Sequence, residues 1–273
     1  MVTIITTTKN RKAFLEKATR SVLSQDYPHI EHIVIDGGSS DGTPEFLKRR
    51  EGKYKDRGFI LKWISEKDNG QAEAMNKGAR MAAGEYIAFL NDDDFLEPGA
   101  VKAFAEVFEA HPEIDFVYGD NHKLDSAIGK KELVSYRFYS LHDMTNGGYQ
   151  IPSCASMFRR ALFAKAGYFD ESLRHVAEHD LFTRFTENGA RLYYFPVPFE
   201  TIVEHPGRGT NAFFLRSLRE TKSVNFRHGA SRLSRFYLLY LRDRYFGRLF
   251  GGLKSNMPRL YNVLKHIFNN VTP

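Results

Sequence analysis

The chain contains little cysteine and no long apolar run. Cys154 is the only cysteine among 273 residues, which excludes an internal disulfide bond and suits a reducing compartment. No uncharged apolar run approaches the roughly 20 residues that a membrane-spanning helix needs, and the longest one in the C-terminal part is Phe236–Leu241. No basic and apolar leader precedes the strand-like start at Val2–Ile5. We therefore expect a cytoplasmic protein.

Two nucleotide-site signatures are also absent. Gly37, Gly38 and Gly42 lack the Gly-x-Gly-x-x-Gly spacing that a dinucleotide-binding dehydrogenase needs between strand and helix. Residues 6–11, Thr-Thr-Thr-Lys-Asn-Arg, are not the Gly- and Lys-rich phosphate loop typical of a sugar nucleotidyltransferase. The sequence has no internal repeat and no low-complexity segment either. The first absence argues against a dehydrogenase, and the second leaves a nucleotidyltransferase as a secondary alternative.

Charge is unevenly distributed along a chain whose composition, with 42% hydrophobic and 26% charged residues, is that of an ordinary globular protein. The net charge is +6, but residues 225–273 contain nine Lys and Arg against one acid, so residues 1–224 carry −2. A basic tail indicates an anionic partner, either membrane lipid or nucleic acid. Its interleaved aromatics and arginines favour a peripheral position at the inner face of the cell membrane, and the alternative is a helical pair packed on the body. Nucleic acid is unlikely as the partner because no nucleic-acid-binding module accompanies the charge.

Apolar strands alternate with amphipathic helices through residue 118. Such alternation predicts an α/β fold with a doubly wound, mostly parallel central sheet flanked by helices. After residue 120 the periodicity weakens, and the uncharged stretch 145–158 is typical of a binding loop region. From about residue 216 the chain is mostly helix-compatible, which predicts a C-terminal helical extension. The predicted strands are 2–6, 30–35, 59–64, 86–90, 116–118, 191–195 and 201–204. The predicted helices are 12–24, 71–83, 99–110, 160–166 and 180–188, and a further helix starts at Thr43-Pro44. Gly84 is the predicted C-cap of the helix 71–83.

The turn Asn91–Asp94 follows the buried strand 86–90 and crowds anionic groups together. In open α/β sheets, ligands bind beyond the carboxyl ends of the strands, so chemistry is expected at this turn. Adjacent carboxylates repel one another, and a divalent cation with hard oxygen ligands relieves the repulsion. The alternative is a solvated acidic turn before the helix that Pro98-Gly99 begins. The turn alone does not decide between the two.

A glycine-rich turn, Asp36–Pro44, follows the second predicted strand. Its three glycines let the backbone come close to a ligand, and Thr43 before Pro44 is a natural N-cap and first-turn pair. Exposed amides at such a helix start suit an anion or a nucleotide.

The sequence contains an ordered set of short blocks. They are the strand 2–6, Asp36–Thr43, Ala74–Gly78, Asn91–Asp94, Ile151–Arg160, Gly167–Glu171 and Glu178–Phe185. This set strongly resembles family 2 glycosyltransferases with the GT-A fold, and it covers roughly residues 2–210. One block would be weak evidence, whereas the ordered set is specific.

The resemblance implies an inverting transfer of a sugar from a nucleotide-diphosphate donor, by default a UDP-sugar, to a hydroxyl of a glycan or lipid-linked acceptor. A divalent metal, Mn²⁺ or Mg²⁺, would neutralise the leaving diphosphate. By position, Asp93 matches the metal-binding carboxylate, and His205 matches a histidine that can approach the metal or the phosphates. Glu178 matches the catalytic base, and Asp180 is the second candidate. The donor-binding positions are Thr7, Lys9, Asp36, Asn76, Asn91, Asp92 and Arg208.

The sequence departs from the family pattern at two of these sites. Glu178 stands where relatives usually have Asp, and Gly37 stands where many have a second acid that contacts uracil, so Asp36 is the candidate for that contact. The implied organisation is a nucleotide-sugar-binding half (1–120), an acceptor-binding and catalytic-base half (121–215) and a basic aromatic tail (216–273). A non-catalytic, glycan- or nucleotide-binding scaffold with the same fold is the alternative from another class. The intact carboxylates argue against it.

Overall fold

A computed structural model of the protein describes residues 1–148, 150–205 and 214–241. The strands in this part of the chain are β1 (Val2–Thr8), β2 (Ile30–Asp36), β3 (Ile60–Ser65), β4 (Tyr86–Phe89), β5 (Phe95–Leu96), β6 (Phe116–Asp125), β7 (Lys130–Val134), β8 (Ser156–Arg159) and β9 (Leu192–Glu204). The helices are α1 (Lys12–Leu23), α2 (Thr43–Asp56), α3 (Gln71–Met81), α4 (Ala100–Ala110), α5 (Leu162–Ala166), α6 (Ala177–Glu187), α7 (Phe214–Arg227) and α8 (Arg235–Leu241), with a π-helical turn η1 (Asp143–Gly147) and a 3₁₀ turn η2 (Ser153–Ala155).

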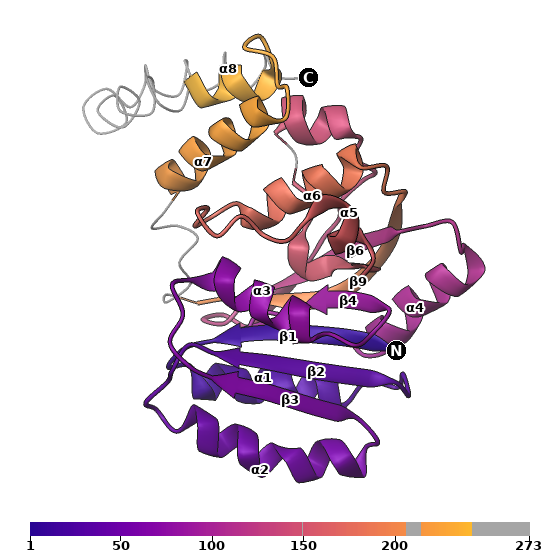
Figure 1. Ribbon diagram of the computed structural model, residues 1–273, viewed down its shortest axis with the longest axis vertical. Helices are drawn as coiled ribbons and strands as arrows, with labels where there is room; N and C mark the ends of the chain where they lie inside the picture. The colour runs from indigo at the N-terminus through magenta and orange to yellow at the C-terminus, as the bar shows by residue number, and fades with distance from the viewer. Residues whose placement is uncertain (149, 206–213, 242–273) are drawn as a thin grey trace.

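The strands of the described residues form one sheet in the order β3-β2-β1-β4-β8-β6-β9-β5, with β7 paired to β6. The first four strands in this order run parallel, as the sequence predicts (Figure 1). β6 and β9 are also parallel, whereas β8 is antiparallel to both β4 and β6. The carboxyl ends of β1, β2, β3 and β4 therefore meet at one edge, and the second half of the chain is joined to them through β8.

Two apolar layers cover the faces of the sheet. On β1, Ile4 packs with residues of α1 and α4, whereas Ile5 packs on the opposite face with residues of α3. This follows from the pleat of a strand, which sends successive side chains to opposite faces. All four residues of β4 are buried, as expected for a strand covered on both faces. The turn that follows β4 is thus fixed from both sides.

The region after residue 120 is more regular than the sequence predicts. Residues 121–158, where the sequence shows little periodicity, contain the end of β6, all of β7 and most of β8. The two short strands expected at 191–195 and 201–204 are one strand, β9, that continues through Pro196 and Pro198. Proline cannot donate a ladder hydrogen bond, and here Pro196 falls within a register shift of the β6–β9 pairing, whereas Pro198 lies opposite Asp120 between two such shifts.

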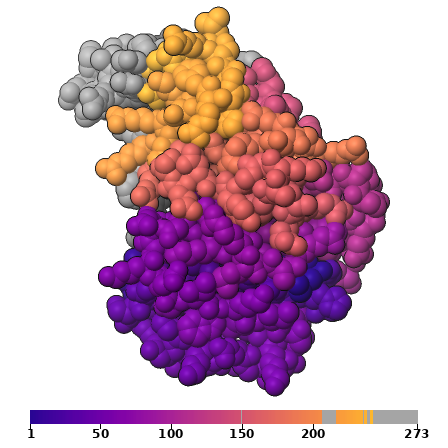
Figure 2. Space-filling model, viewed as in Figure 1, coloured from indigo at the N-terminus to yellow at the C-terminus, as the bar shows by residue number. Residues whose placement is uncertain are grey.

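The C-terminal helices stack on the second half of the domain. Figure 1 shows α7 and α8 beyond α6, and Figure 2 shows them at the end of the molecule opposite β3 and α2. Val224 of α7 is buried in the core, and Tyr237 of α8 packs edge-on against Phe226. The alternative prediction, a helical pair packed on the body of the protein, is therefore confirmed for residues 214–241. The rest of the basic tail lies outside the described residues. No helix in the described part of the chain has both the length and the apolar character that crossing a bilayer requires.

Gly84 has a different role from the predicted C-cap. Helix α3 ends at Met81, and Ala82 beyond it is already extended. A Cβ added to Gly84 would lie 2.6 Å from Thr3 Oγ1 and 2.8 Å from the Thr3 backbone nitrogen. Glycine is therefore required here because the chain passes against β1 as it enters β4.

We expect Gly84→Ala to destabilise the protein by about 1–3 kcal/mol, as overpacking against backbone does. Gly52→Ala is the matched control, because Gly52 lies inside α2 and a Cβ there would meet nothing within 4 Å. That change should stabilise the protein by about 0.5–1 kcal/mol through helix propensity. Urea unfolding followed by circular dichroism measures both, and equal stability of the two variants would contradict the close-approach role of Gly84.

Candidate active site

A cleft of about 620 Å³ opens at the carboxyl ends of β1 and β4. One side is built by the ends of these strands and by the start of α3, and the other by the segment that leads into α6. A residue of α7 completes it. The cleft is lined by Thr7, Thr8, Lys9, Arg11, Asp68, Gly70, Gln71, Ala74, Asn91, Asp92, Asp93, Arg174, His175, Glu178 and Ser217.

Hydrogen bonds fix the orientation of the Asn91–Asp94 turn. Asp94 is fully buried and does not line the cleft, and its carboxylate accepts hydrogen bonds from the Val203 backbone N–H (2.8 Å) and from Asn91 Nδ2 (2.9 Å). Asp92 accepts a hydrogen bond of 2.7 Å from the Thr8 hydroxyl at the end of β1. With Asp94 anchored to β9, both Asp92 and Asp93 line the cleft.

The turn concentrates negative charge in a place with little water. Burial raises the pKa of Asp92 to about 6, and the charges of Asp93 and Asp94 add to the effect, although the hydrogen bond from Thr8 and the charge of Arg11 oppose it. The guanidinium of Arg11 lies 2.6 Å from Asp93 Oδ2 and 3.2 Å from Asp92 Oδ1. The turn is therefore buried and ion-paired with Arg11, and it is not a solvated acidic cap.

The two predicted metal ligands lie side by side. His205 Nε2 is 3.1 Å from Asp93 Oδ2, and the imidazole ring stacks on Phe14 with 4.6 Å between ring centroids. An Asp oxygen suits Mg²⁺ or Mn²⁺, and a neutral imidazole nitrogen is a common metal ligand. Their separation is close to the roughly 3 Å expected of adjacent ligands on an octahedral ion of this size. The residues therefore fit a divalent metal, whose binding stays a prediction.

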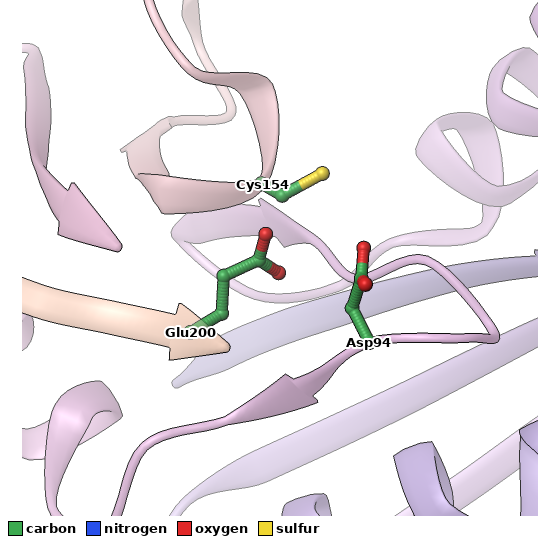
Figure 3. A group of neighbouring side chains, drawn as sticks. All are labelled: Asp94, Cys154 and Glu200. Carbon is green, nitrogen blue, oxygen red and sulfur yellow. The ribbon is translucent and has the colours of Figure 1, made fainter. Parts of the chain in front are cut away.

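A second group of candidate ligands lies behind the turn. Figure 3 shows the carboxyl groups of Asp94 and Glu200 and the sulfur of Cys154 directed toward a common point, and these ligand atoms all lie within 4.8 Å of one another. Burial, with the charges of Glu200 and Asp94, raises the pKa of the Cys154 thiol well above its usual value. A metal ligand must be a thiolate, so this environment favours the hydrogen bond from Asn91 Nδ2 to Cys154 Sγ (2.9 Å) instead. Asp94, Cys154 and Glu200 therefore support the Asn91–Asp94 turn on the side away from the cleft.

Glu178 lies on the wall of the same cleft, in the first turn of α6. Its side chain is partly buried, and desolvation raises its pKa above the ordinary glutamate value. Among the described residues, no other side chain donates a hydrogen bond to its carboxylate. A carboxylate with a raised pKa beside a substrate cleft is suited to accept a proton.

Asp180 lies outside the cleft, which contradicts its candidacy as base. Its carboxylate is fully buried and pairs with Arg184 Nε (2.8 Å), Arg227 Nη1 (3.1 Å) and His228 Nε2 (3.2 Å). Burial raises the pKa of Asp180, but the hydrogen bond from His228 and the charge of Arg184 outweigh it and hold the pKa below the usual value. A carboxylate committed to three cationic partners is structural: it fixes α6 to the end of α7.

The predicted donor-binding residues divide into three groups. Thr7, Lys9, Asn91 and Asp92 line the cleft, as the resemblance implies, and Arg208 lies outside the described residues. Asp36 and Asn76 are buried and do not line it, so the structure does not place them with the other predicted donor-binding residues.

The contacts of Asp36 and Asn76 explain this difference. The carboxylate of Asp36 accepts hydrogen bonds from the Ser39 backbone N–H (3.0 Å) and the Ser65 hydroxyl (2.5 Å), and so shapes the glycine-rich turn. The amide of Asn76 exchanges hydrogen bonds with the backbone of Phe169, at 2.9 and 3.0 Å. Both polar side chains are used to join segments of the chain.

Comparison with known proteins identifies the family. The family model described as glycosyl transferase family 2 matches residues 3–165, more than half of the chain. The chain belongs to this family. This family 2 glycosyltransferase is 32% identical over 185 residues to an uncharacterized glycosyltransferase of Mycobacterium tuberculosis. The match spans 67% of this chain and 68% of that relative.

Two solved structures share the fold of this family 2 glycosyltransferase. S. aureus TarS 1-349 in complex with UDP-GlcNAc has a TM-score of 0.65 and 16% identity over 94% of this chain and 76% of that chain. The mannosyltransferase PcManGT from Pyrobaculum calidifontis, in complex with GDP-Man and Mn²⁺, has a TM-score of 0.64 and 19% identity over 99% of this chain and 79% of that chain. The predicted GT-A fold is confirmed.

Arg11, Asp68 and Arg174 of this family 2 glycosyltransferase line the cleft although no sequence pattern singled them out. A Cβ added to Gly37 would lie 2.6 Å from Asp68 Oδ2, so the carboxylate of Asp68 occupies the space beside Gly37. The Arg174 guanidinium donates to the Asn69 carbonyl and closes over the start of α3. The only signal for Arg11 was its place directly after the first strand, beside Lys9.

His228 links the stability of this family 2 glycosyltransferase to pH. Its ring nitrogens lie 3.2 Å from Asp180 Oδ1 and 2.9 Å from Glu187 Oε2, and the hydrogen bond to Asp180 raises its pKa. A group with a raised folded-state pKa stabilises the protein fully below its unfolded pKa of about 6.5, and this contribution is lost as pH rises through the folded value.

We therefore expect His228→Gln to lower the melting temperature, and the decrease should be largest below about pH 6.5. The difference in melting temperature between the variant and wild type, the gap, should shrink at alkaline pH. Thermal unfolding from pH 5 to 9 measures the gap. His142→Gln, which removes an exposed imidazole, is the control for the substitution itself. A gap of constant size across the range would show that the charge of His228 contributes nothing.

Proposed function

We propose that this family 2 glycosyltransferase transfers a sugar, with inversion, from a nucleoside-diphosphate donor to a hydroxyl of a glycan or lipid-linked acceptor, with the help of a divalent metal. The observation that carries the proposal is that one cleft contains the Asp92–Asp93 pair beside His205 and, on its other wall, Glu178. The neighbour structures with UDP-GlcNAc and with GDP-Man and Mn²⁺ support a sugar-nucleotide donor.

The strand-end side of the cleft suits the diphosphate. Lys9 and Arg11 place positive charge there, and α3 begins at Gln71 on the cleft wall, where its first amides carry the positive end of the helix dipole. A divalent metal held by Asp93 and His205 would neutralise charge on the leaving diphosphate as the sugar bond breaks. Asp68, beside Gly37, is the acid we propose for the contact with the base, which we expect to be uracil.

The α6 side of the cleft suits the acceptor. The acceptor hydroxyl gives its proton to the Glu178 carboxylate, and its oxygen attacks the anomeric carbon. The bond from that carbon to the diphosphate oxygen breaks, and the electron pair leaves with the diphosphate. Burial favours this step because the raised pKa of Glu178 makes the carboxylate a stronger base. Arg174, His175 and Ser217 line the same side and are the proposed acceptor contacts.

A thermal-shift panel tests the donor. We expect UDP with Mn²⁺ to raise the melting temperature by roughly 5–10 °C at 100 times its dissociation constant, because the ligand binds only the folded state. Asp93→Asn should lose the metal-dependent part of this shift, whereas Asp56→Asn, an exposed acid at the end of α2, should keep it. A thermal shift with GDP alone would change the assigned base from uracil to guanine and keep a nucleoside-diphosphate sugar as the donor. If no nucleoside diphosphate causes a shift, the donor proposal is overturned.

Glu178→Gln tests the base. We expect turnover to fall by about 10²–10⁴-fold, with the nucleotide-induced thermal shift unchanged, because only proton transfer is lost. Glu187→Gln, on the same helix and paired with His228, is the matched control and should keep the rate. Measured by release of nucleoside diphosphate with an acceptor present, a full rate in Glu178→Gln would remove this residue from the mechanism.

A further inference from the structure

Arg11 forms the closest cationic contact with the acidic turn among the described residues. Its Nη2 lies 2.6 Å from Asp93 Oδ2 and 3.4 Å from His205 Nε2, and its Nη1 lies 3.2 Å from Asp92 Oδ1. The guanidinium also lies over the ring of Phe14, 4.7 Å from its centroid, and the same ring stacks on His205. These contacts hold the arginine in one position although a third of its side chain is exposed.

The guanidinium and a divalent metal require the same atoms. Asp93 Oδ2 and His205 Nε2 are the pair that fits a metal, and both lie within hydrogen-bonding reach of Arg11 Nη2. Two cations cannot share one carboxylate oxygen at contact distance without strong repulsion. A metal on Asp93 Oδ2 would therefore favour movement of the guanidinium away from that oxygen.

We propose that Arg11 is the resident counter-ion of the metal site: it neutralises Asp92 and Asp93 until a metal displaces it, and the displaced guanidinium then binds the donor diphosphate. The inference rests on the metal-assisted transfer proposed above. Arg11 lines the cleft beside Thr8 and Lys9, where the diphosphate is expected, and its planar fork suits two phosphate oxygens.

Such an exchange couples metal and donor. A metal that binds alone must displace Arg11 and leave the guanidinium without its carboxylates, which weakens binding. A diphosphate supplies a new anionic partner, so each ligand raises the affinity for the other by the same factor. A transferase of this kind would hold its metal firmly only together with its donor.

The test measures Mn²⁺ binding directly, by the electron paramagnetic resonance signal of free Mn²⁺, with and without UDP. Arg11→Met keeps the length of the side chain and its packing on Phe14 but removes the charge. Without nucleotide, we expect this variant to bind Mn²⁺ about tenfold more tightly than wild type, with a smaller gain in affinity on addition of UDP. Arg11→Lys keeps the charge but lacks the planar guanidinium, and its Mn²⁺ affinity should be nearer to that of wild type.

Two control variants separate the possible results. Arg20→Met removes the same charge from an exposed position on α1 and should leave Mn²⁺ affinity unchanged. The double variant Asp93→Asn with Arg11→Met should lose the tighter Mn²⁺ binding of Arg11→Met. That loss would place the ion at Asp93. If wild type binds Mn²⁺ and UDP together but Arg11→Met binds Mn²⁺ no more tightly than wild type, the counter-ion role is overturned and the proposed function stands. If wild type binds neither Mn²⁺ nor any nucleoside diphosphate, both are overturned.

Discussion

Three consecutive carboxylates at the end of a buried strand repel one another, and the surrounding fold compensates each of them separately. Asp94 is anchored to the backbone of β9, Asp92 accepts a hydrogen bond from the end of β1, and Asp93 faces Arg11 and His205. These partners come from both halves of the chain. The turn is therefore held by β1 and β9 together, and the guanidinium of Arg11 places positive charge beside it.

The position of Glu178, the proposed catalytic base, depends on residues beyond the segment 3–165 that the family model matches. Glu220 of α7 accepts hydrogen bonds from the backbone N–H groups of Arg174 (3.1 Å) and His175 (2.8 Å), which lead into α6. His179 of α6 lies 2.7 Å from Asn225 Oδ1 of α7. Helix α7 thus holds the first turn of α6 from outside and sets where Glu178 meets the cleft. Helix α7 therefore helps to build the wall of the candidate active site.

Local patterns predicted the parallel half of the sheet and the cleft side chains that directly follow its strands. Tyr86–Phe89 is an uncharged buried run, so its character and its position before the acidic turn were readable without a structure. The patterns failed where partners are distant. Two short strands were predicted at 191–195 and 201–204, but the pairing with β6 continues across Pro196 and Pro198 with a register shift beside Asp120, and the structure has the single strand β9. Asp36 was expected to contact the donor, but its carboxylate accepts hydrogen bonds from Ser39 in the following turn and from Ser65 at the end of β3.

The sequence by itself determined the family, the doubly wound half of the fold, the acidic turn and the position of Glu178, because these depend on local composition and on the order of short blocks. The tertiary structure alone decided which carboxylates face the cleft, that Asp180 pairs with Arg184 of α6 and with Arg227 and His228 at the end of α7, and that Arg11 pairs with Asp93. Arg11 and Asp93 are 82 residues apart in the chain. Their contact follows from the parallel pairing of β1 with β4, and no local pattern records which side chains such a pairing brings together.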